Sequence, residues 1–159
     1  MEVGSQWYNR VATEIGQYEI TLGPKDAKKY KLDLLRRVAK RVDDFSHTCG
    51  QCQTFQSEIN RLVQELSLLT QMPSKEGIKS HTRAIRSLVD HLKKVHKLVE
   101  KGQYLGMGIG IGMAIGAVLG GVLGAALETP GIGTAVGIGI GLAVGVYLDK
   151  KAEREGRVI

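Results

Sequence analysis

The chain has 159 residues and a formal net charge of +6, which leaves room for one modest soluble domain and one further element but excludes a second domain of that size. The charge is unevenly distributed, because residues 1–101 carry nearly all of it and residues 102–148 contain one acid and no base. The sequence therefore predicts two regions of different character.

Residues 1–101 are predicted to form a cytoplasmic helical head of four helices, because apolar residues recur at intervals of three and four. The first helix is expected over 5–20, and the Gly-Pro pair at 23–24 separates it from a second that ends near Ser46. The third follows Gly50, and the fourth begins at Lys75. We expect an all-α fold in which the last two helices form a coiled-coil hairpin.

The fourth helix has the most regular apolar pattern in the chain. Because no Pro or polar linker follows this pattern, we expect one helix from Lys75 to Leu127, ~80 Å long, with Gly102 as its only hinge. His81 lies within the pattern and is expected to be a buried or interfacial histidine, hydrogen-bonded across the coil. The heptad positions are Ile78, His81, Ile85, Leu88, Leu92, Val95 and Val99.

Glycine recurs every fourth residue along two stretches of the last third of the chain. This spacing places the glycines of each stretch on one side of a helix, where they allow close backbone contact. The pattern resembles the glycine zipper of several membrane protein families over residues 106–145, and that resemblance implies tight helix packing and homo-oligomers. The alternative is that the two ladders face each other within one hairpin. The oligomerisation residues would be Gly108, Gly112, Gly116, Gly120, Gly124, Gly133, Gly137, Gly141 and Gly145.

These two stretches are also predicted to form a transmembrane helical hairpin over 102–149. The uncharged segments cover 104–127 and 132–148, and a turn is expected at 128–131. Lys and Arg flank the hairpin on both outer sides but are absent from the turn, so the positive-inside rule predicts an integral membrane protein with both termini cytoplasmic. The basic tail would be 150–159.

The second helix carries the net charge of the whole chain, because basic and acidic residues balance elsewhere. Three interpretations compete: a solvated helix face, adhesion to anionic headgroups or an acidic partner, and nucleic acid binding. The last is weakest, because few aromatic residues accompany the bases. Headgroup or acidic-partner binding is assigned to Lys28, Lys29, Arg36, Arg37, Lys40 and Arg41.

A Cys-x-x-Cys motif is the one chemically suggestive cluster. If the third and fourth helices fold back on each other, Cys49 and Cys52 come level with His91 and His96, and His47 lies nearby. We expect a candidate metal site of Cys49, Cys52, His47 and His96, which would suit Zn²⁺ or, shared between subunits, an iron–sulfur cluster. The alternative is a pair of reduced thiols near a helix end, with no cofactor.

No phosphate-binding loop, nucleophile elbow or acidic cluster is present, so the chain is not expected to be an enzyme. We predict an oligomeric membrane anchor or scaffold that holds a cytoplasmic protein complex at the bilayer. One alternative is a redox-complex subunit with metal at the cysteines and an apolar interior for lipid or quinone. The other is a channel or pore formed by the oligomerised hairpins.

Overall fold

The computed structural model describes residues 5–127 and 132–159; for 119, 121–127 and 132 it describes the backbone alone. The predicted turn at 128–131 lies outside the described residues. The described part is all-α, with six helices. It divides into two compact units, one comprising the residues up to Lys97 together with Ile159 and the other Leu98–Val158.

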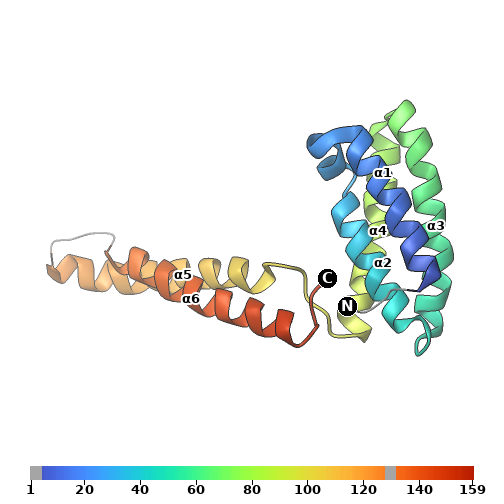
Figure 1. Ribbon diagram of the computed structural model, residues 1–159. Coiled ribbons are helices and arrows are strands. Elements are labelled where there is room, and N and C mark those ends of the chain that lie inside the picture. The colour runs from blue at the N-terminus through green and yellow to red at the C-terminus, as the bar shows by residue number, and fades with distance from the viewer. Residues whose placement is uncertain (1–4, 128–131) are drawn as a thin grey trace. The chain divides into compact units, whose positions relative to one another are not determined.

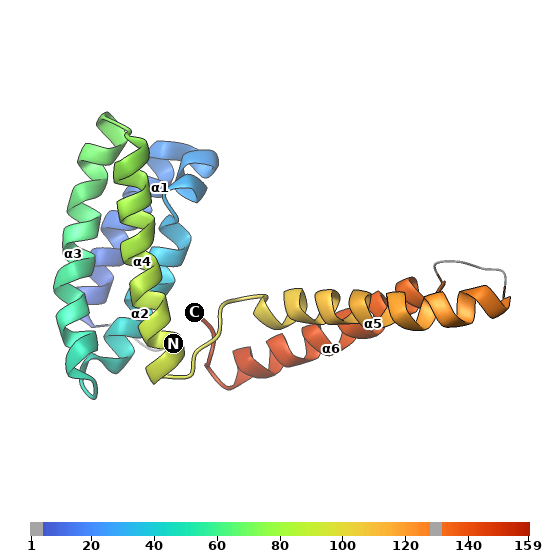
Figure 2. The ribbon, with the colours of Figure 1, turned by 180° about the vertical axis from the view of Figure 1, so that it is seen from behind.

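The first unit is a bundle of four helices lying side by side (Figures 1 and 2). They are α1 (Gln6–Lys29), α2 (Leu32–Ser46), α3 (Gly50–Gln71) and α4 (Lys75–Val95). The predicted apolar positions of all four helices supply its core, which confirms the helical periodicity that the sequence indicated. Fully buried members include Val11, Ile15, Leu35, Val38, Val42, Ile59, Leu62, Leu66, Ile85, Leu88 and Leu92.

The second predicted helix is divided in the structure. Gly23 has φ 71° and ψ 173°, which bends α1 sharply, and the short stretch from Pro24 to Lys29 then follows as its last part. Lys31 has a left-handed φ of 58°, so α2 begins only at Leu32. Between the two segments Tyr30 is buried and its hydroxyl donates to the backbone oxygen of Leu69. The basic residues therefore lie on two short helical segments instead of one.

The predicted continuous helix from Lys75 to Leu127 is wrong, because α4 ends at Val95 and the next helix begins at Gln103. The apolar pattern continues through this break, but its residues are used differently. Val95 is 56% exposed. Val99 donates its N–H to the backbone oxygen of Arg157 at 2.8 Å in an extended pairing, which no local pattern signals.

The second unit is an antiparallel hairpin of α5 (Gln103–Leu127) and α6 (Ile132–Arg154), visible in Figure 1. The described glycines of the two ladders face each other within it, in the pairs Gly108 with Gly141, Gly112 with Gly137 and Gly116 with Gly133. Each step of four residues along α5 is matched by four residues back along α6.

The ladder contacts are too close for any side chain. A Cβ at Gly116 would lie 2.5 Å from the carbonyl oxygen of Gly133, and one at Gly145 would lie 2.7 Å from the Cα of Leu105. Gly120 likewise lies against Gly133, whereas the surroundings of Gly124 are outside the described residues. These contacts are made within one chain, and self-association through the ladders stays a prediction.

A carboxylate of α6 caps the start of α5. Asp149 accepts hydrogen bonds from the backbone N–H groups of Tyr104, at 3.1 Å, and Leu105, at 3.0 Å. These N–H groups belong to the first turn of α5, where no intrahelical acceptor is available, and the negative charge also suits that end of the helix dipole. These two hydrogen bonds join the start of α5 to the C-terminal part of α6.

The predicted location in a membrane is wrong. Among the helices that the structure describes, none combines the length and the apolar character that crossing a bilayer demands. The uncharged segment is only part of the last helix, because α6 continues into Asp149, Lys150 and Lys151, which are charged.

Candidate metal centre

Two helix ends meet at one end of the bundle and bring four potential metal ligands together. Cys49 is the N-cap residue of α3 and has an extended backbone, and Cys52 lies in the first turn of that helix. His91 lies in the last part of α4, and His96 is its C-cap residue. The antiparallel course of α3 and α4 makes these two ends neighbours (Figure 2).

The ligand atoms of Cys49, Cys52, His91 and His96 all lie within 4.8 Å of one another. The Nε2 of His91 is 3.5 Å from the sulfur of Cys49 and 3.6 Å from that of Cys52, and the Nε2 of His96 is 3.3 Å from Cys52. Around a tetrahedral Zn²⁺, bond lengths of about 2.3 Å to sulfur and 2.0–2.1 Å to nitrogen separate the two atoms by about 3.6 Å. The four side chains can therefore hold a metal ion such as zinc.

Aromatic rings hold both imidazoles in place. Phe45 stacks on His96 with ring centres 3.9 Å apart and planes 19° apart. Phe55 meets His91 edge-on at 5.1 Å. Because Phe55 and Cys52 are themselves buried, the inner side of the cluster is apolar, and the rings have few alternative orientations.

The surroundings shift the protonation of all four groups. The backbone N–H of Cys52 lowers the pKa of the Cys49 thiol, whereas burial raises that of Cys52 to about 12. Burial lowers the pKa of both His91 and His96, and for His91 the neighbouring His96 adds to the effect. Neutral imidazoles and thiolates are the forms that bind metal. A bound cation would stabilise the negative charge of a Cys52 thiolate and so allow this buried thiol to lose its proton.

Three of the four predicted metal ligands, Cys49, Cys52 and His96, belong to this cluster. His47 does not: it is exposed at the end of α2, and His91 takes the fourth position. The spacing of the histidines is a signal that could have identified the set. Four residues separate His91 from His96, which matches the H-x₃₋₅-H half of zinc sites, just as C-x₂-C matches the other half.

The predicted basic surface is largely paired with acids. Arg36 lies 3.2 Å from Glu19, and Arg37 lies 2.9 Å from Asp33. Lys40 and Arg41 both pair with Asp44. These bridges leave the solvated-face interpretation the better supported of the three, and binding of headgroups or an acidic partner stays a prediction.

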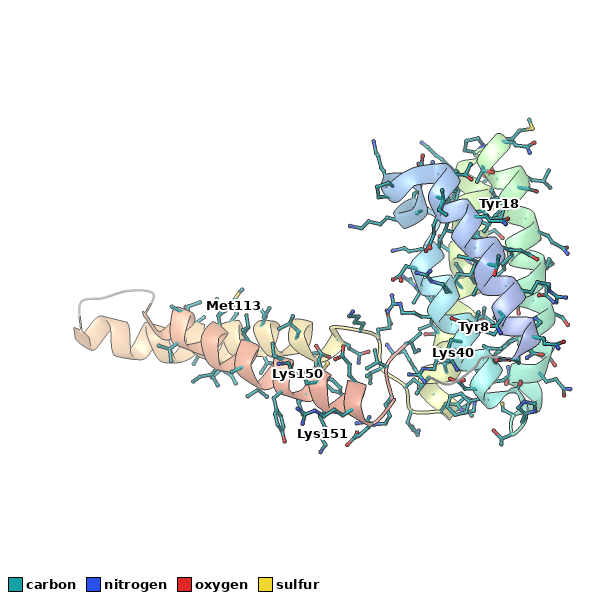
Figure 3. All side chains as sticks on the ribbon, in the orientation of Figure 1. Tyr8, Tyr18, Lys40, Met113, Lys150 and Lys151 are labelled. Atoms are coloured by element: carbon teal, nitrogen blue, oxygen red, sulfur yellow. The ribbon has the colours of Figure 1, made fainter. Side chains whose placement is uncertain are left out.

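Two of the basic residues also lie over aromatic rings. The ammonium of Lys29 is 5.2 Å from the centre of the Tyr30 ring. That of Lys40 is 5.8 Å from the Tyr8 ring, and Figure 3 shows these two residues close together. Lys28 is exposed. The ammonium groups of Lys29 and Lys40 therefore contact aromatic rings of the bundle, which the sequence did not predict.

His81 is buried, as predicted, with 2% of its surface exposed. Its Nε2 lies 3.2 Å from the backbone oxygen of Tyr30, so it is the donor in that bond. Among the described residues its Nδ1 has no hydrogen-bond partner. Burial lowers the pKa of His81, which keeps the ring neutral inside the head.

Comparison with known proteins adds no relative. No protein-family model, curated protein or solved structure matches the chain.

Proposed function

We propose that this chain is a non-enzymatic scaffold protein, in which a structural zinc ion locks the helical head and the glycine hairpin joins copies of the chain. The observation that supports zinc is the set of three sulfur–nitrogen separations, 3.3, 3.5 and 3.6 Å. Two thiols and two imidazoles are also the donor set that tetrahedral zinc prefers.

A single ion fits this cluster better than an iron–sulfur centre does. A cluster with two cysteines on one iron and two histidines on the other separates the sulfurs from the nitrogens across two metals. Here both sulfurs lie within 3.6 Å of the same imidazole nitrogen of His91. The redox-subunit alternative is therefore the weaker one, and the absence of visible absorbance in the protein as first purified, before any metal is added, would exclude it.

The site suits a structural ion more than a catalytic one. Catalytic zinc keeps one position open for water or substrate, whereas four protein ligands close the coordination sphere. Cys52 and Phe55 are buried, whereas Cys49, His91 and His96 are half-buried, so the cluster meets solvent on the side of those three residues. The ion would tie the start of α3 to the end of α4.

The hairpin supports the scaffold part of the proposal. Both of its helices expose large apolar side chains, among them Met113, which projects away from the hairpin in Figure 3. A second copy of the chain offers a matching apolar surface, and a two-fold interface would cover both at once. Exposed members are Met107, Ile111, Met113, Ile115, Val118, Val136, Ile140, Leu142, Val144 and Tyr147.

The zinc proposal is tested by metal content. The full chain is purified without added chelator, and the number of zinc ions per chain is measured by inductively coupled plasma mass spectrometry. We expect one zinc per chain in the natural sequence, loss of zinc in His91→Ala, and one zinc in the matched control His47→Ala. Absence of zinc from the natural protein, or its retention in His91→Ala, would overturn the assignment.

Self-association is tested by molar mass from light scattering. We expect a discrete multi-subunit particle that becomes smaller when Ile140, 62% exposed on α6, is changed to Lys. The control is Leu68→Lys, at a residue 68% exposed on α3, which should leave the mass unchanged. A monomeric natural protein would contradict this part of the proposal alone.

A further inference from the structure

We infer that the two cysteines are the reactive half of this centre, and that a hydroperoxide converts Cys49 and Cys52 to a disulfide and so releases the metal. This inference rests on the proposed zinc site and adds its regulation. The bundle would be locked by zinc under reducing conditions and unlocked by oxidation.

The two sulfurs differ in access in the way that such a reaction requires. Cys49 is half-buried, whereas Cys52 is fully buried three residues later. An oxidant arriving from solvent therefore meets Cys49 first. Cys52 is held behind it, within the 4.8 Å that encloses all four ligand atoms, where it can attack the oxidised sulfur.

The backbone allows the sulfurs to approach bonding distance. A disulfide needs them at about 2.05 Å, so one side chain has to rotate. Cys49 is the N-cap residue, with φ −130° and ψ 110°, and lies outside the regular helix, where the preceding turn does not restrict its side-chain rotamer. Cys52 need not move from its buried position.

The reaction balances with a hydroperoxide as the oxidant. The Cys49 thiolate attacks one oxygen of hydrogen peroxide, the O–O bond breaks, and a sulfenic acid forms while hydroxide leaves and is protonated to water. The Cys52 thiolate then attacks the Cys49 sulfur, an S–S bond forms, and the S–O bond breaks to release a second hydroxide, again protonated. The sulfurs lose two electrons, the peroxide gains them, and zinc remains Zn²⁺.

Oxidation removes both anionic ligands from the ion. Zinc would retain only His91 and His96, which lie at the end of α4, and nothing would then join that end to α3 through the metal. Two neutral imidazoles bind zinc far more weakly than a complete Cys₂His₂ set. The ion therefore leaves, and a reductant with added zinc restores the site.

The test uses the full chain in its reduced, zinc-loaded form, with zinc per chain measured first. Hydrogen peroxide is added, released zinc is followed with a coloured chelator, and the product is mapped by mass spectrometry after digestion. We expect zinc release in step with an intramolecular Cys49–Cys52 disulfide, and recovery of both thiols with dithiothreitol. Zinc release accompanied by sulfinic acid alone, or a disulfide with zinc retained, would overturn the inference.

Two variants separate this inference from the zinc proposal. His91→Ala keeps both thiols, and we expect the same disulfide even though the variant lacks zinc. Cys52→Ser should accumulate sulfenic acid at Cys49, trapped with dimedone, and form no intramolecular bond. If the natural protein lacks zinc, the metal proposal fails, and the disulfide result in that protein still decides whether the pair is reactive.

Discussion

The sulfur of Cys52 lies 3.3 Å from the Nε2 of His96, although 44 positions separate the two residues in the chain. One residue lies in the first turn of α3, and the other follows the last residue of α4. Their approach shows that α3 and α4 fold back on each other in register. α4 ends at Val95, directly before this contact, and Lys97 has a left-handed φ of 56°.

Zinc should stabilise the head. Because the complete ligand set exists only in the folded chain, free zinc at about a hundred times its dissociation constant would add about 2.7 kcal/mol to the free energy of unfolding. We expect urea unfolding with and without a chelator to differ by this amount in the natural protein. Cys49→Ser should show no difference, and an equal chelator effect in that variant would place the metal elsewhere.

The glycines of α5 should divide into two classes when changed to Ala. At Gly116 a Cβ would lie 2.5 Å from the carbonyl oxygen of Gly133, so Gly116→Ala should destabilise the hairpin. At Gly110 nothing lies within 4 Å, so Gly110→Ala should stabilise the helix by roughly 1 kcal/mol through its higher helix propensity. Thermal unfolding followed by circular dichroism measures both, and shifts of the same sign would contradict the observed packing.

Asp149 should stabilise the hairpin, because its carboxylate on α6 caps the start of α5. Removing an N-capping side chain costs roughly 1 kcal/mol, so Asp149→Ala should lower the free energy of unfolding by about that amount. Asp149→Asn keeps an oxygen acceptor for Tyr104 and Leu105 and should lose less. Glu153→Ala, at an exposed position of the same helix, serves as the control and should be neutral.

His81 should make the head less stable in mild acid. Its pKa is lowered in the folded state by burial, so below the ordinary histidine value of about 6.5 the unfolded chain binds the additional proton. Stability is therefore fully present above that pH and is lost as the pH falls. We expect the slope of unfolding free energy between about pH 5 and pH 7 to decrease in His81→Gln. An unchanged slope would mean that other groups account for it.

Most of the helical head could be predicted from the sequence, because local periodicity determines which face of each helix is buried. Val11, Ile59 and Leu88 are examples in which the apolar spacing alone identified core residues. The end of α4 could not be predicted in this way. Val99 continues the apolar pattern but pairs with Val158, and a contact between residues so far apart leaves no local signal.

The candidate site was predictable in part for the same reason. The Cys-x-x-Cys spacing identified Cys49 and Cys52. His96 was identified because it lies beside these cysteines when α3 and α4 fold back on each other. His47 was favoured because it is close to them in sequence, yet it lies at the end of a different helix and is exposed. The membrane prediction was wrong because no described helix meets the requirements for crossing a bilayer. It was made from the uncharged segments alone, whereas α6 extends beyond its uncharged segment to Arg154.

The glycine pairs leave the hairpin with two independent surfaces. Its inner contact is made by backbone atoms at Gly108, Gly112 and Gly116 and their partners on α6, and the side chain of Asp149 adds a further contact at the start of α5. The exposed apolar side chains lie outside these contacts, so their size and chemistry can change without altering how the hairpin closes. The exposed surface of the hairpin can therefore change, and with it the partner that the hairpin binds, while the packing of α5 against α6 stays the same.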